Sequence, residues 1–179
     1  MPATQDLKTR VILVDEKDRE VGTAEKLAAH QQGLLHRAFS IFIFRTLPNR
    51  DRELLLQQRA AAKYHSPGLW TNTCCSHPSP GESIPQAARR RLKEEFNLVI
   101  PLEYRGQFHY TAHFTNGLTE NELDHVLVGT YSNEEITPNP EEIQAFRWMT
   151  AEALKEEMLR EPEQFTPWLA RALEIALAS

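Results

Sequence analysis

Hydrophobic residues alternate with polar ones, or form short continuous runs, in several stretches of the chain, and these patterns predict a β-sheet. Residues 36–44 (HRAFSIFIF) start with alternation and continue as an apolar run, which is typical of a strand buried on both faces. A turn containing Pro and Asn follows, so residues 53–59 (ELLLQQR) are the expected hairpin partner. The same patterns predict further strands at 11–14, 103–114, 122–132 and 143–149.

Helical spacing of apolar residues is clearest in residues 81–97 (GESIPQAARRRLKEEFN), where Pro85 suits the first turn. Further helices are expected at 150–159 and 167–178, and a short helix or turn at 23–30. The strands and helices mix without strict βαβ alternation. We therefore expect an α/β protein of the mixed α+β kind, with a mixed sheet and helices on both sides of it.

Composition and charge limit the class of protein. The 179 residues, 41% of them hydrophobic, fit one domain spanning 1–179, with 1–10 as a flexible N-terminus. The net charge of −5 and the absence of a basic tail argue against nucleic-acid binding. No apolar run reaches the roughly 20 residues that a membrane-spanning helix needs, and the first residues lack a secretory signal. We therefore expect a cytoplasmic monomer that binds neither nucleic acid nor a membrane.

Two adjacent cysteines, Cys74 and Cys75, lie in the segment WTNTCCSHP (70–78) and are the only cysteines in the chain. Four explanations are open: a disulfide, a metal site, a nucleophile or proton carrier, and buried packing. A disulfide is disfavoured, because the cytosol keeps thiols reduced and a bridge between neighbouring residues is strained. The residues alone do not decide among the other three.

Three histidines and two glutamates form a candidate metal site. His30 and His36 flank the loop before the central strand, and His77 follows the cysteine pair. A single histidine is more often a packing or surface residue, but three beside one sheet edge favour a metal. Glu120 and Glu122 lie two residues apart on a strand, so they share a face and repel each other unless solvent or a cation screens them. This set of ligands suits Mn²⁺, Mg²⁺ or Zn²⁺.

The charged helix at 81–97 resembles the Nudix box, in which a loop and a helix place glutamates around Mg²⁺ bound to a diphosphate. The alternative is a solvent-exposed helix whose charges only pair with one another. The matching positions are Glu82, Arg90, Leu92, Glu94 and Glu95. Three positions depart from the pattern, because Ser76, Arg91 and Asn97 replace Gly, Glu and Gly. The box glutamate lost at Arg91 speaks against Nudix hydrolysis, since metal activation of water would be weakened. The basic residues that border the motifs and suit a diphosphate are Lys26, Arg59, Lys63 and Arg91.

The order of these motifs resembles that of the type I isopentenyl-diphosphate isomerases. The matching segments are EKLAAH…LLHRAFSIFIF (25–44), TNTCCSHP, the degenerate Nudix box, ENE (120–122) and TPW. The resemblance runs from about residue 11 to residue 170. It implies a Nudix-like α/β/α sandwich with a mixed central sheet and flanking helices. It also implies an isomerase of isoprenoid biosynthesis, which interconverts isopentenyl and dimethylallyl diphosphate through a tertiary carbocation.

The resemblance also implies roles for individual residues. The catalytic residues would be Cys75, Glu122 and Tyr110, whereas Cys74 would only pack. The ligands of a Mn²⁺, Mg²⁺ or Zn²⁺ ion would be His30, His36, His77, Glu120 and Glu122, and Glu95 would hold Mg²⁺ with the diphosphate. The small allylic or homoallylic diphosphate would be bound by Lys26, Arg59, Lys63, Arg91 and Trp168.

Two other functions compete with the isomerase. A Nudix pyrophosphohydrolase would release phosphate from nucleoside diphosphate derivatives, but Arg91 and the Cys75 motif count against it. A metal-stabilised domain that only binds a partner would have no need for a thiol beside a metal site. We therefore expect the isomerase.

Overall fold

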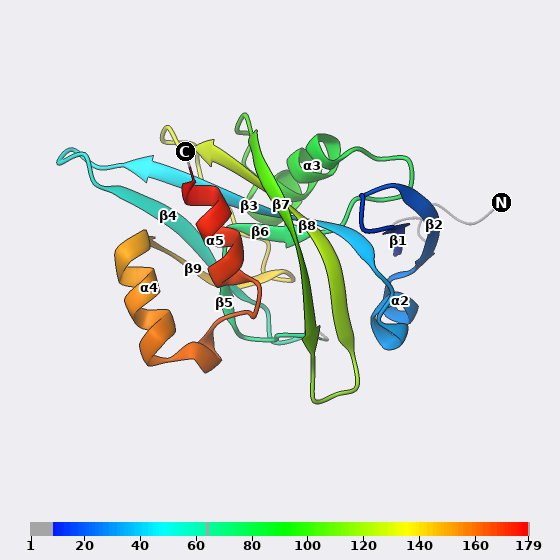
Figure 1. Ribbon diagram of the computed structural model, residues 1–179. Helices are drawn as coiled ribbons and strands as arrows, with labels where there is room; N and C mark the ends of the chain where they lie inside the picture. The colour runs from blue at the N-terminus through cyan, green and yellow to red at the C-terminus, as the bar shows by residue number, and fades with distance from the viewer. Residues whose placement is uncertain (1–8, 64, 179) are drawn as a thin grey trace.

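The computed structural model describes residues 9–63 and 65–178 of the chain. Within these residues, nine strands form one curved, mixed sheet (Figure 1). The strands are β1 (Arg10–Val14), β2 (Glu20–Glu25), β3 (His36–Thr46), β4 (Arg52–Arg59), β5 (Trp70–Thr71), β6 (Cys74–Ser76), β7 (Glu103–His113), β8 (Thr119–Thr130) and β9 (Ile143–Thr150). The helices are α2 (Lys26–Gln32), α3 (Ile84–Phe96), α4 (Ala151–Arg160) and α5 (Leu169–Leu177), with a 3₁₀ turn η1 (Pro162–Gln164).

Strand β3 is the centre of the sheet, because four other strands pair with it. It runs antiparallel to β1, β4 and β6 and parallel to β8. The parallel register places His36 opposite Glu122, and the antiparallel register with β6 places Ser40 opposite Cys75. The mixed sheet that the sequence predicts is thereby confirmed, and its pairing brings segments far apart in the chain to one place.

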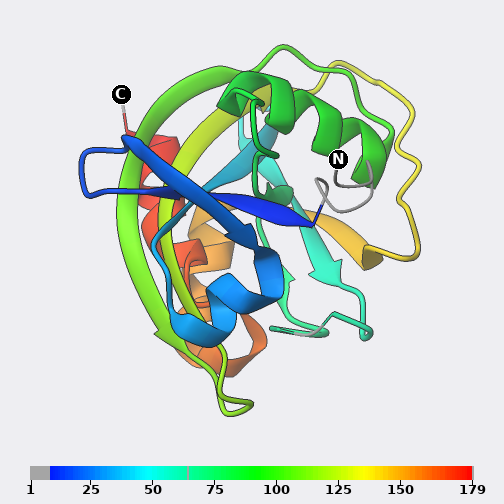
Figure 2. The same ribbon diagram turned by 90° about the vertical axis from the view of Figure 1, so that its right-hand side faces the viewer.

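The apolar run of β3 is buried on both faces, because helices cover both sides of the sheet (Figure 2). Phe42 and Phe44 pack in one core cluster with residues of α4 and α5. Phe39, Ile41 and Ile43 pack in a second cluster with residues of α3. We call these the α5 face and the α3 face. Side chains alternate along a strand, so each strand residue near β3 belongs to one face or the other.

The helices begin where the sequence supplies capping groups. Ser83 and Gln86 form a reciprocal capping box at the start of α3, and Pro85 lies in its first turn. Thr150 accepts a hydrogen bond from the amide of Ala153 at the start of α4. The helix predicted at 81–97 is therefore confirmed, although it begins three residues later than expected.

One prediction at the N-terminal side needs correction, and a second lies mostly outside the described residues. The sequence predicts a helix or turn at 23–30, but β2 continues to Glu25 and only then does α2 begin. Pairing with β1, in which Arg10 lies opposite Glu25, overrides the local helical preference. The flexible N-terminus expected at 1–10 falls largely on residues 1–8, which lie outside the described residues, and Arg10 already belongs to β1. No helix in the described part of the chain is long and apolar enough to span a bilayer.

Candidate active site

The two cysteines lie on opposite faces of the sheet, because they are consecutive residues of β6. Cys74 is fully buried in the α3 face cluster, and its Sγ donates to Glu95 Oε2 at 2.8 Å. Cys75 packs against the α5 face cluster and lines a pocket beside it. Both thiols are free. The local alternation of one short strand therefore gives two neighbouring thiols different surroundings.

Cys75 is surrounded by hydrogen-bonding groups. Its Sγ donates to Asn72 Oδ1 at 2.9 Å and accepts from Trp168 Nε1 at 3.2 Å. Thr71 Oγ1 lies 3.7 Å from the same sulfur. Burial, reinforced by the nearby Asp124 carboxyl, raises the pKa of the Cys75 thiol to about 12. The thiol therefore keeps its proton at neutral pH.

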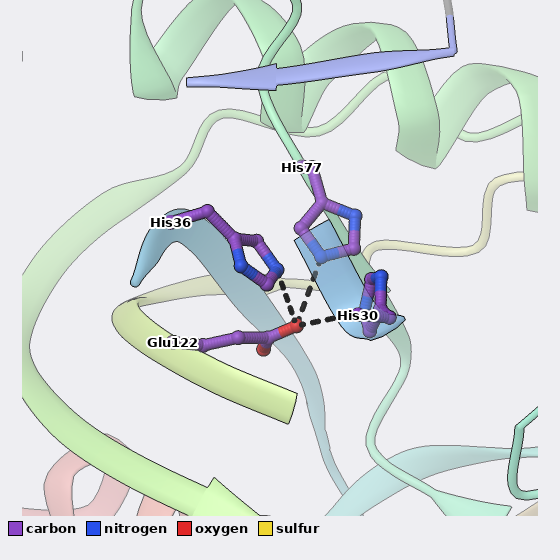
Figure 3. A group of neighbouring side chains, drawn as sticks. All are labelled: His30, His36, His77 and Glu122. Carbon is purple, nitrogen blue, oxygen red and sulfur yellow. Dashed lines mark hydrogen bonds and ion pairs between the residues drawn. The ribbon is translucent and has the colours of Figure 1, made fainter. Parts of the chain in front are cut away.

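Glu122 lies at the centre of a histidine cluster (Figure 3). Its Oε1 is 2.9 Å from His77 Nε2, 3.2 Å from His36 Nε2 and 3.9 Å from His30 Nε2. Burial opposes ionisation of Glu122, but its contacts with His36 and His77 hold its pKa well below the usual range. The parallel pairing of β3 and β8 creates this cluster, since it sets His36 directly beside Glu122.

The four side chains of this cluster fit a divalent ion. Their ligand atoms all lie within 4.8 Å of one another. His30 donates from Nδ1 to the Lys26 carbonyl at 2.6 Å, and His36 donates from Nδ1 to the Leu34 carbonyl at 2.8 Å. A neutral ring that donates from Nδ1 presents a lone pair at Nε2. With protons at Nε2 the rings hydrogen-bond Glu122, and with lone pairs there they can share a cation with its carboxylate. Imidazoles held by carbonyls are the usual arrangement of metal ligands.

Glu120 lies beside a different histidine. Its Oε1 is 2.9 Å from His65 Nδ1, and its Oε2 accepts from the Tyr110 hydroxyl. His30, His65 and Glu120 form a second group whose ligand atoms lie within 4.8 Å of one another. His65 was missed from the sequence, because it lies in the loop after β4, where no strand or helix pattern indicates the direction of a side chain.

Basic residues form one wall of the pocket, and all four that the sequence singled out line it: Lys26, Arg59, Lys63 and Arg91. Burial and the neighbouring cations lower the pKa of Lys26 to about 8. Glu142, which the sequence did not indicate, contacts Lys63 and lies 3.3 Å from Arg91. The concentration of positive charge in a partly enclosed pocket suits a diphosphate.

Glu95 lies behind this wall, on the α3 face. It is buried, and it accepts hydrogen bonds from Gln57 Nε2 at 3.0 Å and from Cys74 at 2.8 Å. Arg91, which lines the pocket, lies 3.4 Å from Glu95. The arginine therefore connects the buried carboxylate of the helix to the pocket.

Trp168 and Phe39 also line the pocket, and the Arg59 guanidinium lies 5.7 Å from the centre of the Trp168 ring. The Trp168 side chain is buried and its ring lies 6.1 Å from that of Tyr110. Tyr110 is not among the residues that line the pocket, but it donates a hydrogen bond to Glu120, which does line it.

Asp124 is a further buried acid, which the sequence analysis missed. It follows Glu122 by two residues and so lies on the same face of β8, and it accepts a hydrogen bond from Ser40 at 2.8 Å. Asp124 follows Glu122 at the same two-residue spacing that separates Glu120 from Glu122, so the sequence pattern could have indicated this acid.

The sheet, the helix that carries the degenerate box and the pocket define a Nudix-fold protein. Residues 34–169 match the NUDIX domain family. The crystal structure of DR0079 from Deinococcus radiodurans has a TM-score of 0.74 at 20% identity, covering 93% of this chain and 98% of that one. A NUDIX hydrolase from Alicyclobacillus acidocaldarius has a TM-score of 0.59 at 13% identity, covering 78% and 90%. At these identities the likeness concerns the fold alone.

Within that class, the chain belongs to the isopentenyl-diphosphate Delta-isomerase family. It is 46% identical over 172 residues to isopentenyl-diphosphate Delta-isomerase 1 of Aromatoleum aromaticum, covering 96% of this chain and 94% of the relative. It is 46% identical over 170 residues to the isopentenyl-diphosphate Delta-isomerase of Burkholderia multivorans, covering 95% and 94%. The family resemblance predicted from the sequence motifs is therefore confirmed.

Proposed function

We propose that this chain interconverts isopentenyl diphosphate and dimethylallyl diphosphate, with Cys75 and Glu122 as the two proton carriers. The observation that carries the assignment is that both side chains line one pocket together with four basic residues and Trp168. The reaction moves a double bond, so one carbon must gain a proton and another must lose one. Two separate proton carriers are needed, and the pocket supplies a thiol and a carboxylate.

The protonation states of the two residues suit this task. The raised pKa of about 12 keeps the proton on Cys75, and the lowered pKa of Glu122 keeps its carboxylate ionised. The pair therefore consists of one group that can donate a proton and one that can accept it. Since the isomerisation is reversible, each residue serves as acid in one direction and as base in the other.

Trp168 would stabilise the tertiary carbocation that forms between the two proton transfers. An electron-rich indole face attracts a cation, by roughly 2 kcal/mol when the site is dry. Its Nε1–H points to Asn72 and Cys75, which fixes the ring at the pocket. The burial of Trp168 also excludes water, which would otherwise trap the cation as an alcohol.

A divalent ion would be held by His30, His36, His77 and Glu122, and Glu120 would join them by turning from its present partners. Mn²⁺, Mg²⁺ and Zn²⁺ are the candidates. The ion would keep the Glu122 carboxylate ionised and fixed in orientation.

The substrate diphosphate would be bound by the four basic residues of the wall, together with Mg²⁺ held by Glu95. For this, Glu95 must exchange its contact with Cys74 or Gln57, and Glu142 must release Lys63 and Arg91 to the phosphate oxygens. We place the enzyme in the cytoplasm, where reducing conditions keep Cys75 a thiol. We expect it to act as a monomer.

Proton NMR of isopentenyl diphosphate incubated with the protein, Mg²⁺ and Zn²⁺ or Mn²⁺ tests the proposal. The two methyl signals of dimethylallyl diphosphate should grow while the inorganic phosphate and diphosphate concentrations stay constant. Release of phosphate from nucleoside diphosphate derivatives, without isomerisation, would instead identify a pyrophosphohydrolase.

A further inference from the structure

Asn72 is a fully buried residue beside the proposed site, and it is not among the residues that line the pocket. It lies between β5 and β6, in the segment that carries Cys75. Hydrogen bonds of its side-chain amide reach β3, β5, β6 and Trp168, the residue before α5. A buried amide with partners on several segments is suited to fix their relative positions.

The orientation of the Asn72 amide is set by two carbonyl oxygens. Nδ2 donates to the backbone oxygen of Ile41 at 3.1 Å and to that of Cys74 at 3.0 Å. A carbonyl oxygen can only accept, so the NH₂ group has to lie on this side of the amide. The side-chain oxygen of Asn72 therefore has to face Cys75 and Trp168.

This oxygen accepts from two groups of the proposed reaction. Cys75 Sγ donates to Asn72 Oδ1 at 2.9 Å, and Trp168 Nε1 donates to it at 3.1 Å. The indole N–H also lies against Cys75 Sγ, at 3.2 Å. Sulfur is a weak acceptor, so the amide oxygen is the stronger of the two anchors of the indole. One buried oxygen thus orients both the thiol and the aromatic ring.

A third donor competes for the same oxygen. Thr71 Oγ1 donates to Asn72 Oδ1 at 2.9 Å and itself accepts from Thr166 Oγ1 at 2.8 Å. A carbonyl oxygen has two lone pairs, so three donors exceed its capacity, and the S–H group is the weakest of the three. The thiol proton can therefore turn toward a substrate while the hydroxyl and the indole keep the oxygen paired.

We infer that Asn72 is a positioning residue of the isomerisation: its oxygen holds the Trp168 ring, aims the Cys75 thiol, and releases the thiol proton without being left unpaired. This inference rests on the proposed roles of Cys75 and Trp168. The basic residues of the pocket do not depend on this oxygen. Loss of the oxygen should therefore lower kcat and leave KM nearly unchanged.

The kinetic test compares Asn72→Leu with Asn72→Asp at equal concentrations of folded protein. Leucine is close to asparagine in size but has no acceptor, whereas aspartate keeps an oxygen toward the thiol and the indole. For Asn72→Leu we expect kcat to fall by about 10²-fold, the usual cost of misplacing a reacting group, with KM near that of wild type. Asn72→Asp should recover part of this loss.

Thr73→Val is the matched control. Thr73 is as buried as Asn72 and adjoins it, but its hydroxyl bonds the backbone amide of Ile43 and the carbonyl of Leu55. This variant removes buried hydrogen bonds from the same segment and leaves the thiol and the indole with their partners. Its kcat should stay close to that of wild type.

A spectroscopic measurement separates positioning from packing. The indole ¹H–¹⁵N signal of Trp168, identified by its loss in Trp168→Phe, reports the hydrogen bond at Nε1. The proton signal should move upfield in Asn72→Leu and stay near its wild-type position in Thr73→Val. It should also stay there in Cys75→Ala, because the amide oxygen and not the sulfur is the main anchor of the ring.

The outcomes distinguish this inference from the proposed function. An indole signal that moves in Cys75→Ala makes the sulfur the anchor and overturns the inference, even if Asn72→Leu does not fold. Wild-type kcat and an unmoved signal in Asn72→Leu, or equal losses of kcat in Asn72→Leu and Thr73→Val, overturn it as well. A wild-type protein that does not isomerise the substrate contradicts the proposed function, and the kinetic role of Asn72 with it.

Discussion

The two faces of strand β6 place two neighbouring thiols in different surroundings. On the α3 face, Cys74 is enclosed by apolar residues and donates to a buried carboxylate, Glu95. On the α5 face, Cys75 shares a pocket with the ionised Glu122, the histidine cluster and Trp168. Burial raises the pKa of both thiols, so acidity alone does not distinguish them.

In the proposed mechanism, the two thiols differ in their access to a second proton carrier. Cys75 and Glu122 face the same pocket, whereas the acid beside Cys74 already accepts hydrogen bonds within the core. A proton can be moved through a substrate only where two carriers reach the same molecule. The alternation along β6 therefore places Cys75 on the face proposed to carry the proton transfers and Cys74 in the core of the other face.

The largest effect is expected for Glu122→Gln. An amide can still ligate a metal but has no useful acid, so turnover should fall by about 10²- to 10⁴-fold even at saturating Mn²⁺ and Mg²⁺. Turnover and bound metal are measured in the same sample. Glu156→Gln, at an exposed position of α4, is the control. Near-normal turnover after the metal is restored would leave Glu122 as a ligand only.

The two faces should also differ in how they hold metal. His36→Ala removes a ligand from the histidine cluster, so it should lower the content of tightly bound ion, measured by mass spectrometry after gel filtration. Glu95→Gln changes the α3 face and should leave that content at the wild-type level. Equal loss in both variants would show that the two sites are not separate.

A smaller effect is expected at Trp168. Trp168→Phe and Trp168→Leu both lose the Nε1–H contacts with Asn72 and Cys75, but only phenylalanine keeps an aromatic face. Turnover of the leucine variant should therefore lie about tenfold below that of the phenylalanine variant. Similar turnover in two variants of equal thermal stability would argue against cation stabilisation by the ring.

The smallest effect on turnover should follow Cys74→Ala. Removing the thiol takes a hydrogen bond from buried Glu95, which should lower the free energy of unfolding by roughly 1–3 kcal/mol. Urea unfolding gives this value, and turnover should stay within a few-fold of wild type. A loss of turnover comparable to that of Glu122→Gln would contradict the assignment of Cys74 as a packing residue.

Much of the fold could be predicted from local patterns. The run of β3 and the capped helix α3 each carry their signal within one segment, and the structure confirms both. Strands β5 and β6 were not predicted, since two or three residues carry no periodicity. Their pairing with longer strands defines them, and that pairing is not local.

The candidate site was predictable to the extent that its residues lie in motifs. The structure brings Cys75 and Glu122 to one pocket, as the family resemblance implies. His65 and Glu142 belong to loops, where only the folded chain shows which way a side chain is directed. Glu122 lies with His36 and His77, whereas Glu120 lies with His65, and His30 is near both glutamates. These contacts depend on the three-dimensional fold, and no sequence spacing specifies them.

The most direct test compares Cys75→Ala with Cys74→Ala by proton and deuterium NMR of isopentenyl diphosphate in D₂O. Both variants are loaded with the same metals and assayed at equal concentrations of folded protein. We predict that Cys74→Ala isomerises the substrate and incorporates deuterium at a rate near that of wild type, and that Cys75→Ala falls by at least about 10²-fold. Equal rates in the two variants would contradict the claim that the α5 face alone carries the chemistry.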